Sequence, residues 1–154
     1  MELIVVTGLS GAGRHSVMGA LEDLGCTALD NVPPRLLEPL LELESQLNPG
    51  RDRLVVGMDS RQPKFAEEFA PMVERFIARH IPVQVIFVEA DDATLLRRYS
   101  ETRRPHHLSQ DSPEEGIQLE RDLLAPIRAL ATGVLDTSNL NLSDMRLLVG
   151  AMLP

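Results

Sequence analysis

The 154-residue sequence has little of several residue types, and each shortage excludes a class of protein. Cys26 is the only cysteine, so an internal disulfide and a cysteine-rich metal site are both excluded. Tryptophan is absent and Tyr99 is the only tyrosine, so the stacking platforms of single-stranded nucleic acid binders are missing. No run approaches the roughly 20 apolar residues of a membrane span, and the first seven residues lead straight into Gly8 with no basic leader. We therefore expect a cytoplasmic protein with no membrane contact.

Positive charge is also scarce. The formal net charge is -8, and Lys64 is the only lysine. Proteins that grip nucleic acid over a broad surface need clustered basic residues to neutralise phosphates. We therefore expect no direct nucleic acid binding, and any anion site must be local.

The residues that are present predict an α/β fold. At 44% hydrophobic and 25% charged, the chain has the composition of one globular domain. Short apolar runs predict strands at residues 3–7, 26–29, 54–58, 83–88 and 134–135, and residues with helical periodicity lie between them, at 16–24, 34–47, 64–79, 93–102, 113–130 and 143–152. This alternation predicts a three-layer, doubly wound parallel sheet of about five strands. Ser112 and Ser143 are the predicted caps of the last two helices, and residues 105–112 are a candidate loop or lid.

A glycine-rich segment follows the first predicted strand and opens the first helix. In this setting, backbone N–H groups and the helix N-terminus form a phosphate-binding loop. The spacing is that of the Walker A pattern GxxxxGK[ST], and the predicted nucleotide-binding residues are Gly8, Leu9, Ser10, Gly11, Ala12, Gly13, Arg14, His15 and Ser16. The alternative is a tight strand-to-helix turn that binds nothing.

Two positions of this loop depart from the pattern. Arg14 stands where lysine belongs, and its planar head cannot superpose on an ammonium that slides along the β- and γ-phosphates. His15 stands where serine or threonine belongs, so the hydroxyl that ligates Mg²⁺ is missing. Ser16 has a hydroxyl but lies about 100° further round the helix. We expect Mg-dependent hydrolysis to be weak or absent.

Acidic residues follow several predicted strands, where ligands sit in doubly wound sheets. Asp59 follows the third strand and has two alternative roles. It either holds a metal ion through a water molecule, or it is the N-cap of the next helix. Asp30 follows the second strand and either positions a second substrate or caps the helix near Pro33; we expect the cap.

The only concentrated positive patch comprises Arg97, Arg98, Arg103, Arg104, His106 and His107. Arginines beside a mobile loop can cover a γ-phosphate, and Arg103 and Arg104 are the candidates for this role, with Asp59, in any catalysis. Arg97 and Arg98 are interpreted as a solvated helix face paired with Glu101 and Asp91. Without a third ligand at useful spacing, the two histidines are interpreted as loop residues. Cys26 is predicted to be core.

Several blocks resemble the N-terminal domain of the RapZ/YvcJ family of bacterial nucleotide-binding proteins. They are GLSGAGRHS at 8–16, ALEDLG at 20–25, DNVP at 30–33, MDSR at 58–61, RRYSETRR at 97–104 with His106, ERDLLAPIR at 120–128 and DTS at 136–138. The blocks span nearly the whole chain in order.

The resemblance implies a P-loop kinase-like fold, ATP or GTP as ligand, and NTP hydrolysis in some members. It also implies a regulatory role, because RapZ is an RNase adapter whose C-terminal domain senses RNA. On this basis residues 1–154 form a single nucleotide-binding domain without the family's C-terminal domain, either as a piece of a longer chain or as a lone module. Candidate partners are a nucleoside triphosphate, other proteins and a second copy of the chain. The alternatives are a small-molecule P-loop kinase or NTPase, with Asp59 near a metal and Asp30 near the acceptor, and a nucleotide-free scaffold.

Overall fold

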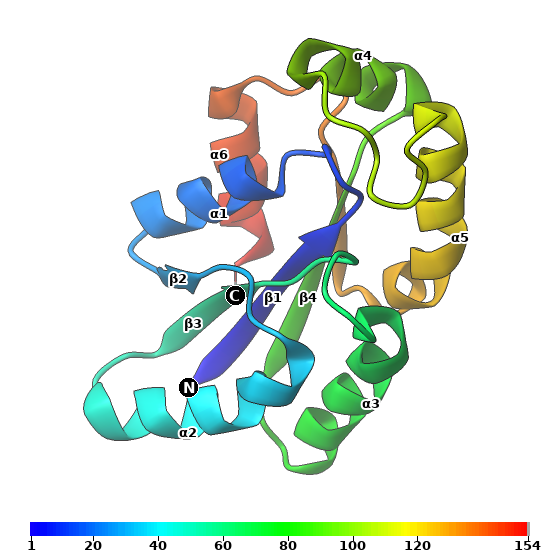
Figure 1. The fold of residues 1–154 in the computed structure, drawn as a ribbon. Helices are drawn as coiled ribbons and strands as arrows, with labels where there is room; N and C mark the ends of the chain where they lie inside the picture. Colours follow the sequence, from blue (N-terminus) through cyan, green and yellow to red (C-terminus); the bar gives the residue numbers. More distant parts are fainter. Residues whose placement is uncertain (154) are drawn as a thin grey trace.

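The protein is a five-stranded parallel sheet with helices on both faces. The computed structural model describes residues 1–153 (Figure 1). The elements in chain order are β1 (Glu2–Gly8), α1 (Arg14–Asp23), β2 (Thr27–Leu29), the short 3₁₀ helix η1 (Pro34–Leu36), α2 (Leu37–Leu47), β3 (Arg53–Gly57), α3 (Phe65–Ala78), β4 (Val83–Glu89), α4 (Asp92–Thr102), α5 (Pro113–Leu130), β5 (Gly133–Asp136) and α6 (Leu142–Met152). The predicted fold class is confirmed.

The strand order β2-β3-β1-β4-β5 places β1 at the centre of the sheet. Strand β1 pairs with β3 on one side and with β4 on the other, and both pairings are parallel. The chain runs from β1 toward β2 and β3, whereas it runs from β4 toward β5. The strand order therefore reverses between β1 and β4, and in open α/β sheets ligands bind beyond the carboxyl ends of the strands at such a point.

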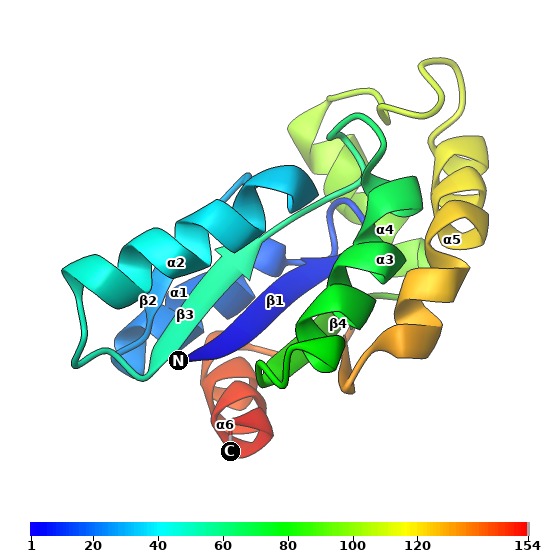
Figure 2. The same ribbon diagram turned by 90° about the horizontal axis from the view of Figure 1, so that it is seen from below.

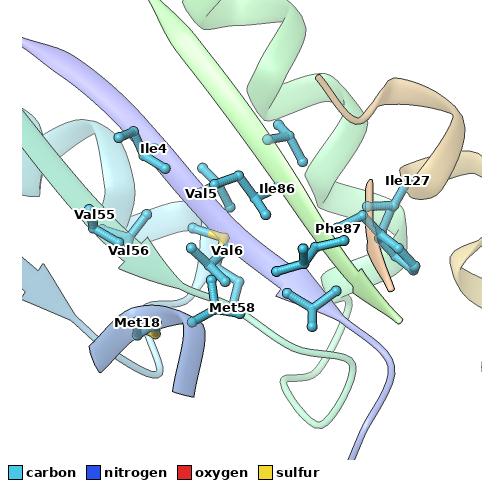
Figure 3. Packing of buried hydrophobic residues seen from close by; sticks show 14 of the residues in the cluster. Ile4, Val5, Val6, Met18, Val55, Val56, Met58, Ile86, Phe87 and Ile127 are labelled. Atoms are coloured by element: carbon cyan, nitrogen blue, oxygen red, sulfur yellow. The ribbon is translucent and has the colours of Figure 1, made fainter. Parts of the chain in front are cut away.

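The helices cover the two faces in separate groups. Helices α1 and α6 pack together on one face, and α3 and α5 pack together on the other (Figures 1 and 2). The central strands are buried from both sides, as continuous β-branched runs predict. Val5 and Val56 on neighbouring strands point to one face of the sheet, whereas Val6 and Ile86 point to the other face, on which Met18 of α1 packs (Figure 3). Within residues 1–153, none of the helices has the length and apolarity needed to cross a membrane.

The helix caps agree with the sequence in one case and differ in another. The Ser112 hydroxyl accepts a hydrogen bond from the Glu115 N–H at the start of α5, so this predicted cap is confirmed. Helix α6 begins one residue earlier than predicted, and its cap is Asn141, two residues before Ser143, so the prediction of Ser143 was wrong. Asn141 and Asp144 form a reciprocal capping box, which satisfies two backbone N–H groups where Ser143 would satisfy one.

Candidate functional site

The glycine-rich segment forms a tight loop between β1 and α1. Gly8, Gly11 and Gly13 all have positive φ, of 147°, 82° and 104°. A Cβ on Gly8 would overlap the Val88 carbonyl of the neighbouring strand, so only glycine fits there. Gly13 is the N-cap of α1 and offers no side chain to the helix. The first N–H groups of α1 therefore have no side-chain cap, and this is the condition in which a helix N-terminus binds an anion.

Three side chains from later segments hold this loop in shape. The Thr137 hydroxyl, after β5, donates to the Ala12 carbonyl, and Arg98 of α4 donates to the Gly11 carbonyl over 2.9 Å. Glu120 of α5 accepts from the Ser10 N–H and from the Ser10 hydroxyl, both at 2.8 Å. Because carbonyl groups are fixed from outside, the loop is pre-organised with its remaining N–H groups free for a ligand.

Arg14 does not extend along the loop as a Walker lysine would. Its side chain is only 8% exposed, and its guanidinium forms ion pairs with Asp30 and, over 3.1 Å, with Asp59. The guanidinium crosses the end of β3, where a Cβ on Gly57 would overlap it. A cation is therefore present beside the loop, but it is bound by two carboxylates.

Asp59 is saturated with donors. Its two oxygens accept from the Arg61 N–H, from the Arg61 guanidinium and from Arg14. Burial raises the pKa of Asp59, but the hydrogen bonds and charge of Arg61, together with the charge of Arg14, outweigh it and lower the pKa below its usual value. Asp59 is thus ionised and neutralised by two arginines.

The predicted capping roles of Asp59 and Asp30 are wrong. Helix α3 has Lys64 as its N-cap, and η1 has Pro33, with no side-chain cap in either case. Asp59 instead accepts from the N–H two residues further on, which closes an Asx turn. Asp30 accepts from the Asn31 N–H and pairs with Arg14 and with His15 at 3.2 Å.

The residues around Asp59 do not fit a magnesium ion of the kind that accompanies phosphate loops. Position 15 carries an imidazole, turned toward Asp30, in place of a hydroxyl. The carboxylate of Asp59 uses its oxygens on arginine donors, which leaves no lone pair for a hydrated ion. Arg14 instead lies 3.1 Å from the Asp59 carboxylate.

A cavity of about 290 Å³ opens beside the loop. Its lining includes the loop itself and a set of polar side chains, namely Arg14, His15, Asp59, Arg61, Tyr99, Thr102, Arg104 and His107. Arg104 therefore reaches the cavity, whereas Arg103 caps the C-terminus of α4 and is not part of its lining. A second cavity of about 780 Å³ also borders Gly11 and Gly13, and its lining includes Arg98, Leu140, Asn141, Leu142, Ser143 and Met145.

Arg98 differs from its interpretation as part of a solvated helix face. Besides Gly11, it donates to the hydroxyl and the carbonyl of Thr137, at 3.2 and 3.4 Å. It therefore joins α4 to the phosphate loop and to the end of β5. Arg97, one residue earlier, is exposed as predicted.

The structure brings Glu120 to the two histidines of the loop 105–112. Glu120 is 1% exposed, and its carboxylate lies 3.4 Å from His106 Nε2 and 3.7 Å from His107 Nε2. Ser60 donates to Glu120 over 2.6 Å and lies 2.8 Å from His107 Nε2. Burial lowers the pKa of His107, and the charge of Glu120 opposes this only in part.

Tyr99 lies against the same cluster. Its ring is 5.2 Å from the His106 ring and approaches Gly11 of the phosphate loop. Burial, together with the charge of Glu120, raises the pKa of Tyr99 to about 12.

Glu120 was not singled out as a site residue from the sequence, and its only signal was the block at 120–128 of the family resemblance. Thr137 lies just after the fifth predicted strand, where ligands sit in doubly wound sheets, but no role was predicted for its side chain. Neither has a local pattern that marks it, because each acts through a contact with a distant segment.

The chain is similar to bacterial proteins named as nucleotide-binding proteins. At 39% identity the chain matches a nucleotide-binding protein of Dictyoglomus thermophilum, covering 94% of this chain and 50% of the relative. A nucleotide-binding protein of Symbiobacterium thermophilum is 40% identical, over 95% of this chain and 49% of that protein. The chain thus spans about half the length of these relatives.

Solved structures share the fold at low sequence identity. Shikimate kinase from Acinetobacter baumannii matches with a TM-score of 0.61 and 19% identity, over 100% of this chain and 96% of that one. A gluconokinase from Sinorhizobium meliloti matches with a TM-score of 0.57 and 17% identity, over 97% and 90%. These neighbours show a P-loop kinase-like fold. The family model of the RapZ-like N-terminal domain matches residues 1–153, and the chain belongs to this family.

Proposed function

We propose that this domain binds ATP or GTP as a regulatory ligand, without needing Mg²⁺, and hydrolyses it weakly or not at all. The observation that carries the proposal is the position of Arg14: the loop is shaped for phosphate, yet the cation at the lysine position is held by Asp30 and Asp59. A guanidinium there supplies positive charge beside the phosphates. While two carboxylates hold this guanidinium, it cannot move to stabilise the negative charge that develops on the phosphoryl group during transfer.

The two cavities suggest how a nucleotide lies in the site. The phosphates would occupy the loop at Gly11 and Gly13, which line both cavities. The base would lie in the larger cavity, where the Arg98 guanidinium and the apolar side chains of Leu140 and Met145 offer stacking and contact area. We expect both adenine and guanine nucleotides to bind.

A small-molecule kinase is the second candidate, and one observation favours it. The cavity of about 290 Å³ on the far side of the loop is lined by Arg61, Arg104 and Tyr99, and it could hold an anionic acceptor. This candidate requires turnover with a metal, whereas the proposal above does not.

Calorimetry with ATP and with GTP, each in Mg²⁺ and in EDTA, tests the proposal. Tyr99 provides a second readout, because it is the only tyrosine, no tryptophan competes with its fluorescence and its ring lies beside Gly11. We expect equal affinity with and without metal, and no turnover. Binding that requires Mg²⁺ and leads to hydrolysis would establish the kinase or NTPase instead, and no binding would leave a nucleotide-free scaffold for protein contacts.

The double variant Arg14→Lys with His15→Ser restores the Walker A residues. We expect it to make binding depend on Mg²⁺, because the hydroxyl becomes available and Asp59 is freed from Arg14. The chain offers a matched control, since an arginine and a histidine are also adjacent at 79–80, at the C-terminal end of α3. Arg79→Lys with His80→Ser should leave both affinity and metal independence unchanged.

A further inference from the structure

The nitrogen atom Nε2 of His106 is a buried polar group with no hydrogen-bond partner within the described part of the chain. The side chain is completely buried. Glu120 Oε1 is 3.4 Å away, but not in a direction that makes a hydrogen bond. An orphaned buried nitrogen beside a buried carboxylate is costly unless a third group joins them.

The surroundings of this nitrogen have the composition of a metal site. His106, His107 and Glu120 each offer one ligand atom, and these three atoms lie within 4.8 Å of one another. His107 Nε2 is 3.7 Å from Glu120 Oε2. Ligands about 2.0–2.1 Å from a tetrahedral zinc ion are about 3.3 Å apart. The two nitrogen-to-oxygen distances, 3.4 Å to Oε1 and 3.7 Å to Oε2, are each close to that value. The carboxylate would therefore bind through both oxygens or turn to share one of them, and the two rings would approach each other.

We propose that His106, His107 and Glu120 bind a divalent transition-metal ion of the zinc type. Two imidazoles and one carboxylate suit zinc, whereas magnesium prefers oxygen ligands alone. Three protein ligands leave a fourth position open. His107 is part of the lining of the cavity beside the glycine-rich loop, so the site adjoins this cavity.

The ligands are supported as those of metal sites usually are. Glu120 is oriented by hydrogen bonds from Ser10 and Ser60, which hold the carboxylate between the two rings. His106 packs on Gly116 of α5, where a Cβ would overlap its ring. The two imidazoles are stacked with 4.7 Å between their centroids. Glycine at position 116 therefore makes room for the first ligand.

Two local bonds must change when the metal enters. The Leu108 N–H donates to His106 Nδ1 over 3.1 Å, so a neutral ring carries its proton on Nε2. Metal binding moves this proton to Nδ1, and the Leu108 amide loses its acceptor. The Ser60 hydroxyl must also turn away from His107 Nε2. Both changes are confined to two loops, and the three ligands stay on the same elements.

Such an ion would fix the loop that contains the two histidines to helix α5. Through Glu120 and Ser10 it would also be connected to the phosphate loop. The proposal does not depend on nucleotide binding, and it is tested without nucleotide.

The test uses the chain purified without a histidine tag and titrated with Zn²⁺ by calorimetry and with Co²⁺ by visible absorption. We expect one ion per chain, a Co²⁺ spectrum typical of tetrahedral coordination, and loss of that spectrum when Zn²⁺ is added. His107→Gln should weaken Zn²⁺ binding at least about tenfold, as should Gly116→Ala by displacing His106. His80→Asn is the control, because position 80 has φ of 56°, which asparagine tolerates, and lies outside the cluster.

Circular dichroism confirms that each variant is folded before its affinity is compared. The proposal is overturned if the folded chain binds neither ion, if His107→Gln binds as tightly as the unchanged chain, or if His80→Asn weakens binding as much as His107→Gln does.

Discussion

At the scale of single residues, the site is defined by which charges are already paired. Arg14 and Arg61 neutralise Asp30 and Asp59 without any ligand. Arg14 and Asp59 are both nearly buried, at 8% and 7% side-chain exposure, so neither charge can be relieved by water if its partner is removed. The pairing therefore contributes to the stability of the fold as well as to the chemistry of the site.

Asp59→Asn tests this pairing. We expect the free energy of unfolding at pH 7 to fall by about 2 kcal/mol, since Arg14 loses the more buried of its two carboxylate partners and keeps only Asp30. The pKa of Asp59 is lowered in the folded state, so its contribution is present above the unfolded pKa and is lost as the pH falls through the folded value. The free energy of unfolding, measured with urea between about pH 2.5 and pH 7, should therefore fall less steeply toward acid pH in the variant than in the unchanged chain, because the variant lacks this carboxyl.

Asp23→Asn provides the control for that experiment. Asp23 pairs with Arg146 on the surface, with both side chains more than half exposed. We expect a change of less than about 0.5 kcal/mol. Equal losses in the two variants would contradict the structural role of Asp59.

The phenol of Tyr99 can be titrated alone, because no other tyrosine or tryptophan absorbs with it. The absorbance change of ionisation in a rapid pH jump should have a midpoint near pH 12, since burial and the Glu120 charge disfavour the anion. In guanidinium the midpoint should return to about 10. The raised pKa means that this group's contribution to stability is complete below pH 10 and is lost as the pH rises toward 12. A native midpoint at the unfolded value would show that Tyr99 is not packed as described.

At the scale of elements, the strand β1, the loop and helix α1 act as one unit. The loop starts where β1 contacts β4 and ends at an uncapped helix. Two glycines of this unit differ in the space available for a side chain. Gly8 has no room for a side chain, whereas Gly19 in the middle of α1 has nothing within 4 Å of the place where a Cβ would lie.

Alanine substitutions at these two positions should therefore have opposite effects. Gly8→Ala places a side chain at a positive φ and against the Val88 backbone, so we expect the free energy of unfolding to fall by about 4 kcal/mol or more. Gly19→Ala should stabilise the protein by about 0.5–1 kcal/mol, because alanine favours the helix. Thermal or urea unfolding measures both. Destabilisation by Gly19→Ala of the same size as that by Gly8→Ala would contradict the strand-to-helix geometry.

At the scale of the whole molecule, the sequence predicts what is local. The strands, the helices and the glycine-rich turn between β1 and α1 follow from apolar runs, helical spacing and glycine positions, and their bounds agree with the structure to within a few residues. The caps of α6 and η1 were wrong because several polar residues compete near each start, and tertiary position decides between them.

The contacts that complete the site could not be predicted in the same way. Arg98 and Gly11 are 87 positions apart, Ser10 and Glu120 are 110 apart, and Ala12 and Thr137 are 125 apart. No periodicity or spacing in one sequence connects such pairs. The approach of Glu120 to the two histidines has the same cause: the third ligand was missing from the sequence neighbourhood because it comes from a separate helix.

The way the phosphate loop is held has a consequence for the order of events during synthesis. The ribosome releases the glycines of this loop before the side chains that fix it, since Thr137 follows Ala12 by 125 positions. Strand β1 likewise cannot pair with its second neighbour, β4, until residues 83–88 have been synthesised. A nascent chain therefore carries the motif long before it carries the binding site, and we expect ligand affinity to appear abruptly, when the last third of the domain has emerged.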